Sequence, residues 1–451
     1  MTKMFIRTFI LMISPLFFLD NSFCQELRDA KADFYKSSKE FVHEIDSIMA
    51  RQRALKKIDL EESFEGRVEN IEVLEESNRK LSIESFENYL KEYPDSDHVP
   101  DVLYRLGKLY YEDASQKLIR DTESYEKEYQ KFVRGEVQVL PPEPNIDYSL
   151  AVGVLTKLIN NYKGYRYRDD AMYLLGYAYF EEGQMGKAVP VFRQIINEFP
   201  NSDRLPEIYT RLGENYFDMD DFDTAISYYS RVLNYPDSVY YENVLYKLGW
   251  IYYSRGKINE SADFFVTLID TIDKKYGYDH NNTFKTEAKN YISVGFSESS
   301  NGIKDAYSFF RNVGTKNYEY EIMTKICELY IMSDRVKEAR SSVSFVLSKY
   351  PDHPENPVLQ DKLISDLRKY DSYADMNQER EKMITLFGEG SLWRAKNIED
   401  LKAIMTADSL IEKQLISVAM YHQEKGDQTG KRSEYIAAAK LYYDFLKKHP
   451  S

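Results

Sequence analysis

Three stretches of nineteen residues align without a gap: YPDSDHVPDVLYRLGKLYY from Tyr93, FPNSDRLPEIYTRLGENYF from Phe199 and YPDSVYYENVLYKLGWIYY from Tyr235. Each begins with an aromatic residue and a proline, which lacks an amide N–H and disfavours helix in the residue before it. Asp or Asn and Ser follow, and these side chains cap the first unpaired N–H groups of a helix. Each stretch therefore predicts the end of one helix and the start of the next.

The residues around each Leu-Gly pair predict how two helices pack. Leu248-Gly249 is followed by Tyr252, Ala262, Phe265 and Leu268, and steps of three, four and seven residues place side chains on one face of a helix. We expect the glycine to lie where two helices cross closely, with a large ring filling the space opposite. The Leu-Gly pairs at Gly176, Gly213 and Gly249 recur at nearly constant spacing, which predicts an all-α solenoid of helix–turn–helix repeats, an α–α superhelix.

This pattern of Leu-Gly-x-x-Tyr, then Ala, an aromatic and Pro resembles the tetratricopeptide repeat. Cys327 takes the glycine place in one unit, so we expect this thiol to be a packed small side chain. The resemblance implies that the first helix of each unit lines a concave groove that receives peptides. Four units match well: 169–202, 206–239, 242–275 and 320–353.

The rest of the chain departs from the repeat. A long insert, 273–283, interrupts the array. No polar cap follows the last helical pattern, so we expect the solenoid to be open at its C-terminal end, either because the chain is part of a longer protein or because another surface covers it. The predicted organisation is a signal peptide at 1–24, an amphipathic helical arm at 25–79, a first repeat-like unit with an extended helix at 80–134, a Pro-rich loop at 135–146, the repeat array at 147–353, and degenerate helical pairs at 354–451.

The N-terminus resembles a secretory signal. Lys3 and Arg7 precede an apolar run, 8–19, that is shorter than the roughly 20 residues needed to span a bilayer. Ser22 and Cys24 are small enough for cleavage before Gln25. Acylation of Cys24, as in a lipoprotein, and an uncleaved anchor are the alternatives. We expect an exported bacterial protein of the periplasm or outer membrane.

The arm at 25–79 carries a narrow apolar stripe. Leu27, Phe34, Phe41, Ile48 and Leu55 recur every seven residues, which is typical of a long helix packed along one seam. The stripe predicts either a helix that caps the solenoid or coiled-coil self-association through 27–58.

The composition excludes several kinds of partner and site. Lys and Arg number 60 against 74 Asp and Glu, a net charge of −14, so we expect no binding of nucleic acid or of anionic membranes by bulk electrostatics. The six histidines are scattered without metal-ligand spacing, and no phosphate-binding loop or nucleophile motif occurs. We therefore expect no enzyme activity, no catalytic residue, no metal site and no cofactor. The acidic run at 218–223 lacks the spacing of a calcium loop and predicts a solvated corner.

Residues flanking the Leu-Gly pairs are the candidate lining of the groove. Tyr and Trp offer large contact area with a polar tip, and Arg can pair with carboxylates. The alternative is that many of these rings pack between neighbouring repeats. The candidates are Tyr104, Arg105, Tyr173, Tyr177, Phe180, Arg211, Phe217, Tyr246, Lys247, Trp250 and Tyr253.

Three functions fit these features. The first is a non-enzymatic scaffold or adaptor of the cell envelope that holds a protein or peptide partner, with envelope assembly components as candidates. The repeat style is similar to exported bacterial repeat proteins, including the lipoprotein of the outer-membrane β-barrel assembly machinery. The second is a module that binds glycans or cell-wall polymers on the same aromatic groove. The third is the helical part of a longer cell-wall enzyme.

Overall fold

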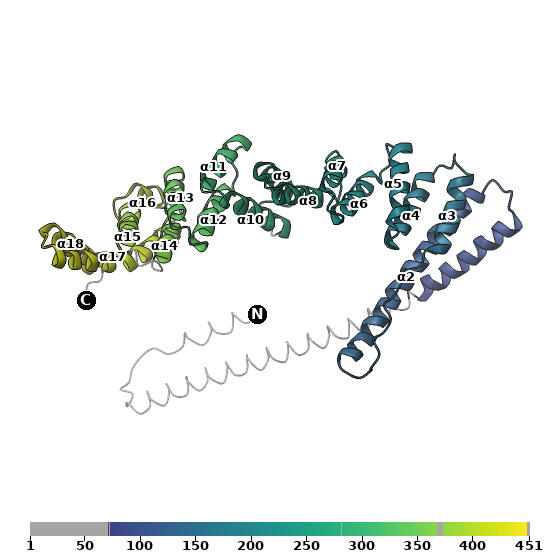
Figure 1. Cartoon of the computed structure of the whole chain (residues 1–451), viewed down its shortest axis with the longest axis horizontal. Helices are drawn as coiled ribbons and strands as arrows, with labels where there is room; N and C mark the ends of the chain where they lie inside the picture. The colour runs from purple at the N-terminus through teal and green to yellow at the C-terminus, as the bar shows by residue number, and fades with distance from the viewer. Residues whose placement is uncertain (1–70, 72, 281, 368–372, 449–451) are drawn as a thin grey trace, which may run out of the picture. The chain divides into compact units, whose positions relative to one another are not determined.

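The computed structural model describes residues 71, 73–280, 282–367 and 373–448. The predicted signal peptide and the apolar stripe of 27–58 lie outside these residues. The described part is helical, without a strand, and the predicted all-α solenoid of helix pairs is confirmed (Figure 1). The chain forms two compact units, one ending at Gln184 and one beginning at Met185. No helix of the described part is both long and apolar enough to cross a membrane.

The first unit is built around one long helix. Residues 73–92 form a helix, followed by α2 (Val99–Val133), α3 (Ser149–Asn161) and α4 (Arg168–Glu181). A non-helical stretch that contains the Pro-rich segment joins α2 to α3, and these two helices pack together. A Cβ on Gly107 of α2 would lie 2.6 Å from the side chain of Leu155 on α3. The side chain that packs against the Leu-Gly pair of α2 therefore comes from α3, which follows the Pro-rich stretch.

The second unit continues as helix pairs. Pro206 lies in the first turn of α6, where a missing N–H costs least. Its helices are α5 (Met185–Glu198), α6 (Leu205–Asp218), α7 (Phe222–Val232), α8 (Tyr241–Ser254), α9 (Ile258–Tyr276), α10 (Thr283–Ser297), α11 (Gly302–Val313), α12 (Glu319–Met332), α13 (Val336–Lys349), α14 (Asn356–Leu367), α15 (Tyr373–Phe387), α16 (Leu392–Lys396), α17 (Leu401–Thr429) and α18 (Arg432–Lys448).

The expected pairing of a small residue with a large one is confirmed inside the repeats. A Cβ on Gly249 of α8 would lie 2.7 Å from the ring of Phe265 on α9. Cys327 is fully buried on α12, as predicted for a packed small side chain. Ser261 of α9 donates a hydrogen bond of 2.8 Å to the carbonyl oxygen of Gly249, which adds a polar link at the same crossing.

Several turns between successive helices share one backbone feature. Gly183 and Gly256 have φ of 69° and 70°, in the left-handed region that glycine adopts at little cost. Asp220 and Asp334 take the same conformation, with φ of 57° and 58°. Asp is among the few other residues that tolerate it, so the helix pairs keep the same turn without glycine.

The first helices of successive pairs adjoin one another in the second unit. Helix α8 packs against α10, α10 against α12, α12 against α14, and α14 against α17. We call the side of the second unit formed by α6, α8, α10, α12 and α14 the first-helix face. It is the surface on which the second-unit groove candidates lie.

Candidate partner-binding surface

In the first unit, the candidate rings of α4 form a row. The centroids of Tyr173 and Tyr177 are 5.8 Å apart, and those of Tyr177 and Phe180 are 6.1 Å apart. Tyr111 of α2 extends the row, with its ring 6.3 Å from Tyr177. All four side chains are partly exposed, so the row combines contacts within the protein with surface available to a partner.

The other first-unit candidates lie on α2. Tyr104 stacks on Tyr167 at 5.7 Å, and the Arg166 guanidinium lies 4.7 Å from the Tyr167 centroid. Tyr165 donates a hydrogen bond of 2.9 Å to Asp101. Arg105 is exposed. Tyr104 therefore belongs to a cluster whose other rings come from the α3–α4 connection.

In the second unit, three rings from three helices meet. The Trp250 centroid on α8 is 5.3 Å from that of Phe217 on α6 and 6.2 Å from that of Phe222 on α7. The Lys247 ammonium lies 4.2 Å from the centre of the Phe217 ring, within the range of a cation–π contact. We call Phe217, Phe222, Lys247 and Trp250 the Trp250 cluster. Its members are half-buried, so they pack between repeats while one side stays open.

On the first-helix face, hydrogen bonds from tyrosine to glutamate side chains link α8 to the α10 region. Tyr246 donates to Glu287 at 2.6 Å, and Tyr253 donates to Glu298 at 3.1 Å. Both rings also contact Tyr291 of α10. Burial, followed by the bond to Glu287, raises the pKa of Tyr246, so this phenol stays neutral and acts as a donor. These candidates bridge α8 and α10.

Arg211, the charged candidate on α6, contacts acidic residues of its own helix. Its guanidinium lies 3.7 Å from Glu207 and 3.4 Å from Glu214. Because all three side chains are partly exposed, these pairs contribute little to stability. An acidic group of a partner could therefore replace them at small cost.

Ion pairs join α10, α12 and α14 on the first-helix face. Lys289 of α10 lies 2.5 Å from Glu321 of α12, and Lys362 of α14 pairs with Glu328 of α12. Two hollows of about 410 and 200 Å³ share Glu328 and Lys362 in their walls. No sequence motif predicts these pairs, because their partners are 32 and 34 residues apart and belong to different repeats.

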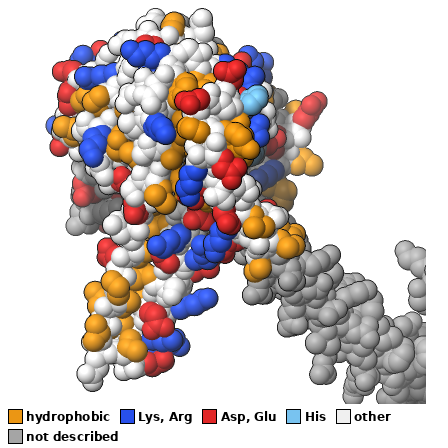
Figure 2. Space-filling model, turned by 90° about the vertical axis from the view of Figure 1, so that its right-hand side faces the viewer, with side chains coloured by type: hydrophobic (Ala, Val, Ile, Leu, Met, Phe, Trp, Pro, Cys, Tyr) orange, Lys and Arg blue, Asp and Glu red, His pale blue; other side chains and the backbone are white. Residues whose placement is uncertain are grey.

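The acidic run at 218–223 and the Cys327 thiol have structural roles. Asp221 accepts a hydrogen bond of 3.2 Å from the Thr224 amide and caps α7, and Asp223 pairs with Arg255 at 2.8 Å. In the part of the chain that the structure describes, no three His, Cys, Asp or Glu side chains are grouped to hold a metal ion. Burial raises the pKa of the Cys327 thiol to about 12, so its nucleophilic thiolate is scarce near neutral pH. On the side of the molecule that Figure 2 shows, acidic and basic side chains are interspersed without a field of one sign.

Comparisons with known proteins identify repeats in this region. Residues 170–202 and residues 206–236 each match a family model described as tetratricopeptide repeat. No curated protein matches the chain. These two segments are therefore tetratricopeptide repeats, as the Leu-Gly pattern predicted.

Solved structures with similar folds share little sequence with this chain. A tetratricopeptide repeat protein from Parabacteroides merdae is 12% identical with a TM-score of 0.29, covering 64% of this chain and 99% of that one. The C-terminal part of a TPR repeat-containing protein from Cytophaga hutchinsonii is 13% identical with a TM-score of 0.32, covering 74% and 95%. A Rap protein complexed with competence and sporulation factor is 12% identical with a TM-score of 0.25, covering 74% and 97%.

Proposed function

We propose that this protein is a non-enzymatic scaffold of the bacterial cell envelope that holds a protein or peptide partner on its first-helix face. The tetratricopeptide repeats at 170–202 and 206–236 support an interaction scaffold. Export rests on the N-terminal sequence, whose basic start, short apolar run and small residues before Gln25 fit a signal peptide.

The Trp250 cluster is the observation that carries the proposal. Its rings come from α6, α7 and α8, so the backbone of two repeats fixes their positions before any partner arrives. Half-buried Trp and Phe side chains lose little further entropy on binding, and they bury large area in a complex. The Lys247 ammonium at the same place can pair with an acidic group, and Tyr246 and Tyr253 extend the aromatic surface toward α10.

A capture experiment tests this surface. Tagged protein is incubated with envelope extract, and bound proteins are quantified for wild type and for Trp250→Ala combined with Tyr246→Ala. We expect the specific partners of wild type to be lost from the double variant. Tyr278→Ala combined with Tyr443→Ala is the matched control, because both of its tyrosines are well exposed and outside the first-helix face. Unchanged partners in the Trp250 and Tyr246 variant would contradict the proposal.

A charge variant separates binding from folding. Lys247→Glu keeps all three rings and reverses the charge beside Phe217. We expect it to weaken capture of the same partners while its thermal unfolding stays close to that of wild type. Enrichment of cell-wall fragments in place of proteins would instead indicate a glycan platform.

The proposed compartment has its own test. Fractionation of cells that express the full chain should place it in the periplasm or with the outer membrane, and N-terminal sequencing should begin at Gln25. Labelling with a radioactive fatty acid that disappears in a Cys24→Ser variant would show acylation instead. Recovery of the full-length chain from the cytosol would contradict export.

A further inference from the structure

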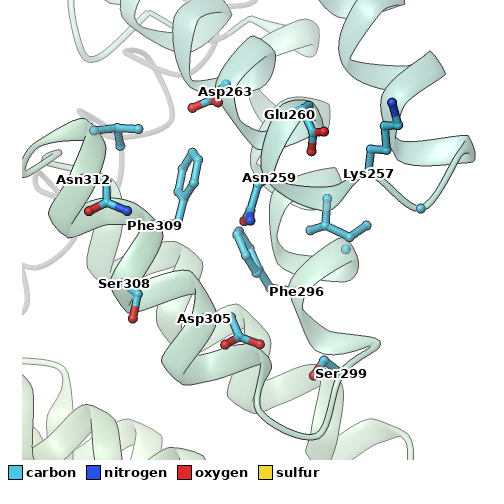
Figure 3. A pocket seen from close by; sticks show the side chains of 14 residues that line it. Lys257, Asn259, Glu260, Asp263, Phe296, Ser299, Asp305, Ser308, Phe309 and Asn312 are labelled. Atoms are coloured by element: carbon cyan, nitrogen blue, oxygen red, sulfur yellow. The ribbon is translucent and has the colours of Figure 1, made fainter.

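The second unit has a cavity away from the first-helix face. It lies between α9 and α11, over the C-terminal end of α10, and has a volume of about 700 Å³. Figure 3 shows Glu260 and Asp263 on one side and Asp305 on the other, with the rings of Phe296 and Phe309 between them. The cavity therefore combines acidic walls with an aromatic floor.

The cavity exists because α11 leaves α10 at an unusual junction. Gly302, the first residue of α11, is so close to the carbonyl oxygen of Phe296 that a Cβ would overlap it. Helix α11 packs less closely against α10 than α9 packs against α8. In the α8–α9 pair, Gly249 lies opposite the ring of Phe265. The residue at the same spacing before Phe310 is Val294, so the α10–α11 pair has no glycine at the position opposite this ring.

The next repeat fixes this junction. Tyr330 of α12 donates a hydrogen bond of 2.6 Å to the carbonyl oxygen of Ser299, and Arg335 donates one of 2.5 Å to that of Ser297. Both acceptors lie where the chain passes from α10 to α11. The end of α10 and the wall formed by α11 are therefore held in place, and the cavity is built into the fold.

The acidic side chains of the cavity are unpaired. Glu260, Asp263 and Asp305 make no ion pair with any residue that the structure describes. Lys257, the cation in the lining, has its ammonium 5.6 Å from the centre of the Tyr252 ring. Burial, followed by repulsion from Glu260, raises the pKa of Asp263. The lining thus holds three carboxylates without an ion-pair partner and one lysine, whereas Glu321 and Glu328 of the first-helix face have lysine partners.

The aromatic floor narrows the kind of cation that fits. Phe296 and Phe309 line the cavity and are themselves 3% and 7% exposed, so a ligand would meet a small part of each ring below and carboxylates at the sides. The carboxylates do not converge closely enough to hold a metal ion among the described residues. Lys and Arg side chains join an apolar stem to a cationic head, and the head gains from both carboxylates and ring faces.

We propose that this cavity binds arginine or lysine side chains of a basic polypeptide segment in a partner protein. The apolar stem lies on Phe296 and Phe309, and the head lies among Glu260, Asp263 and Asp305. Asn259 and Asn312, also in the lining, can hydrogen-bond the backbone of the segment. Helices α9 and α11, the second helices of two pairs, form its walls, and α10 contributes Gly295 and Phe296. Tyr246, Lys247 and Trp250 of the first-helix face do not line it.

A pair of peptides tests the charge requirement. The probes are a fluorescent Ala-Arg-Ala-Arg-Ala peptide and its counterpart with citrulline, which keeps the shape of arginine without the charge. Anisotropy titrations with the full chain should show about fivefold or greater tighter binding of the arginine peptide, as one or more partly exposed ion pairs give. The preference should shrink at high salt. Equal affinities, or no binding of the arginine peptide at millimolar concentration, would overturn the proposal.

Three variants locate the binding. Glu260→Gln with Asp263→Asn and Asp305→Asn should abolish the arginine preference. The control Asp218→Asn, Asp220→Asn and Asp237→Asn removes the same charge from exposed carboxylates outside the cavity and should keep it. Ser308→Trp fills the cavity without changing charge and should also abolish binding. An arginine preference that survives the cavity neutralisation or Ser308→Trp, or is lost in the control, would show that the site is elsewhere.

The first-helix face supplies an independent check. Protein with Trp250→Ala and Tyr246→Ala should keep the arginine preference, because those residues do not line the cavity. Loss of the preference in that variant, with folding intact, would place peptide binding on the first-helix face and contradict the separate site.

Discussion

The ring of Tyr229 lies against the backbone of Gly213, where a Cβ on the glycine would be 2.5 Å from two ring carbons. The two residues are on α6 and α7, and the tyrosine side chain is fully buried. The same relationship joins Gly249 to Phe265 and Gly107 to Leu155. Each glycine thus lets one helix of a pair approach the other closely enough for a large side chain to fill the crossing.

We expect Gly213→Ala to destabilise the protein. The added methyl group improves helix propensity by about 1 kcal/mol, but it forces the buried ring to move, and overpacking of this kind costs about 1–3 kcal/mol. The measurement is the free energy of unfolding in urea. Gly153→Ala on α3 is the control, because nothing lies within 4 Å of its added Cβ. That control should be neutral or stabilising, and equal effects of the two substitutions would contradict the packing argument.

The Leu-Gly pattern predicted the helix pairs that follow it, because the residues of each crossing lie within one repeat and have fixed spacing. It did not reveal the form of the α10–α11 pair. There Val294, counted back from Phe310, stands where Gly213 and Gly249 stand in their repeats, and Gly302 is required by its contact with the Phe296 carbonyl. A close approach of backbone to backbone leaves no periodic mark in the sequence.

The candidate site was harder to predict for a related reason. Trp250 and Phe217 were candidates because they lie near Leu-Gly pairs in the sequence, but whether a ring is open or packed depends on neighbours from other repeats, such as Phe222 for Trp250. The cavity carboxylates Glu260 and Asp305 belong to different repeats, so no local motif joins them.

We expect the protein to lose stability in mild acid because of His353. Burial lowers its pKa below the ordinary 6.5, although Glu355 opposes this effect. Its ring stacks on Tyr320, and its Nδ1 accepts a hydrogen bond of 3.2 Å from the Glu355 amide, which requires the neutral form at this nitrogen. The fold therefore favours neutral His353. Its contribution is complete above pH 6.5 and declines as the pH falls from 6.5 through the lowered pKa.

The His353→Asn variant checks this pH dependence. Asn can accept the same amide hydrogen bond in an Asx turn but does not titrate. The melting temperature should fall between pH 7.5 and pH 5.5 by more in wild type than in His353→Asn. Comparing the two proteins cancels the titration of the other histidines. Parallel losses in both proteins would show that His353 does not contribute.

Cys327 should be inert in the folded protein. Its thiol is fully buried on α12, and burial raises its pKa to about 12. In a Cys24→Ser background, we expect no reaction with a thiol reagent at pH 8 under native conditions and complete reaction in denaturant. Rapid modification of the native protein would show that α12 opens readily or that the thiol is accessible.

The buried pair of Lys285 and Asp273 should stabilise the junction of α9 and α10. Lys285 pairs with Asp273, and its ammonium also donates a hydrogen bond of 2.6 Å to the carbonyl oxygen of Tyr278. Both charged side chains are almost fully buried. The lysine therefore holds the insert between α9 and α10 in place, because it contacts Asp273 at the start of the insert and Tyr278 within it.

We expect Lys285→Met to cost about 3–5 kcal/mol, since it leaves Asp273 charged, buried and unpaired. Asp273→Leu combined with Lys285→Met should recover much of that loss, because burying two apolar side chains carries no desolvation penalty for charge. Urea unfolding of the two single variants and the double variant forms a mutant cycle. A strongly favourable coupling between the two changes is the expected result. If the single losses simply add in the double variant, the ion pair is not what holds the insert.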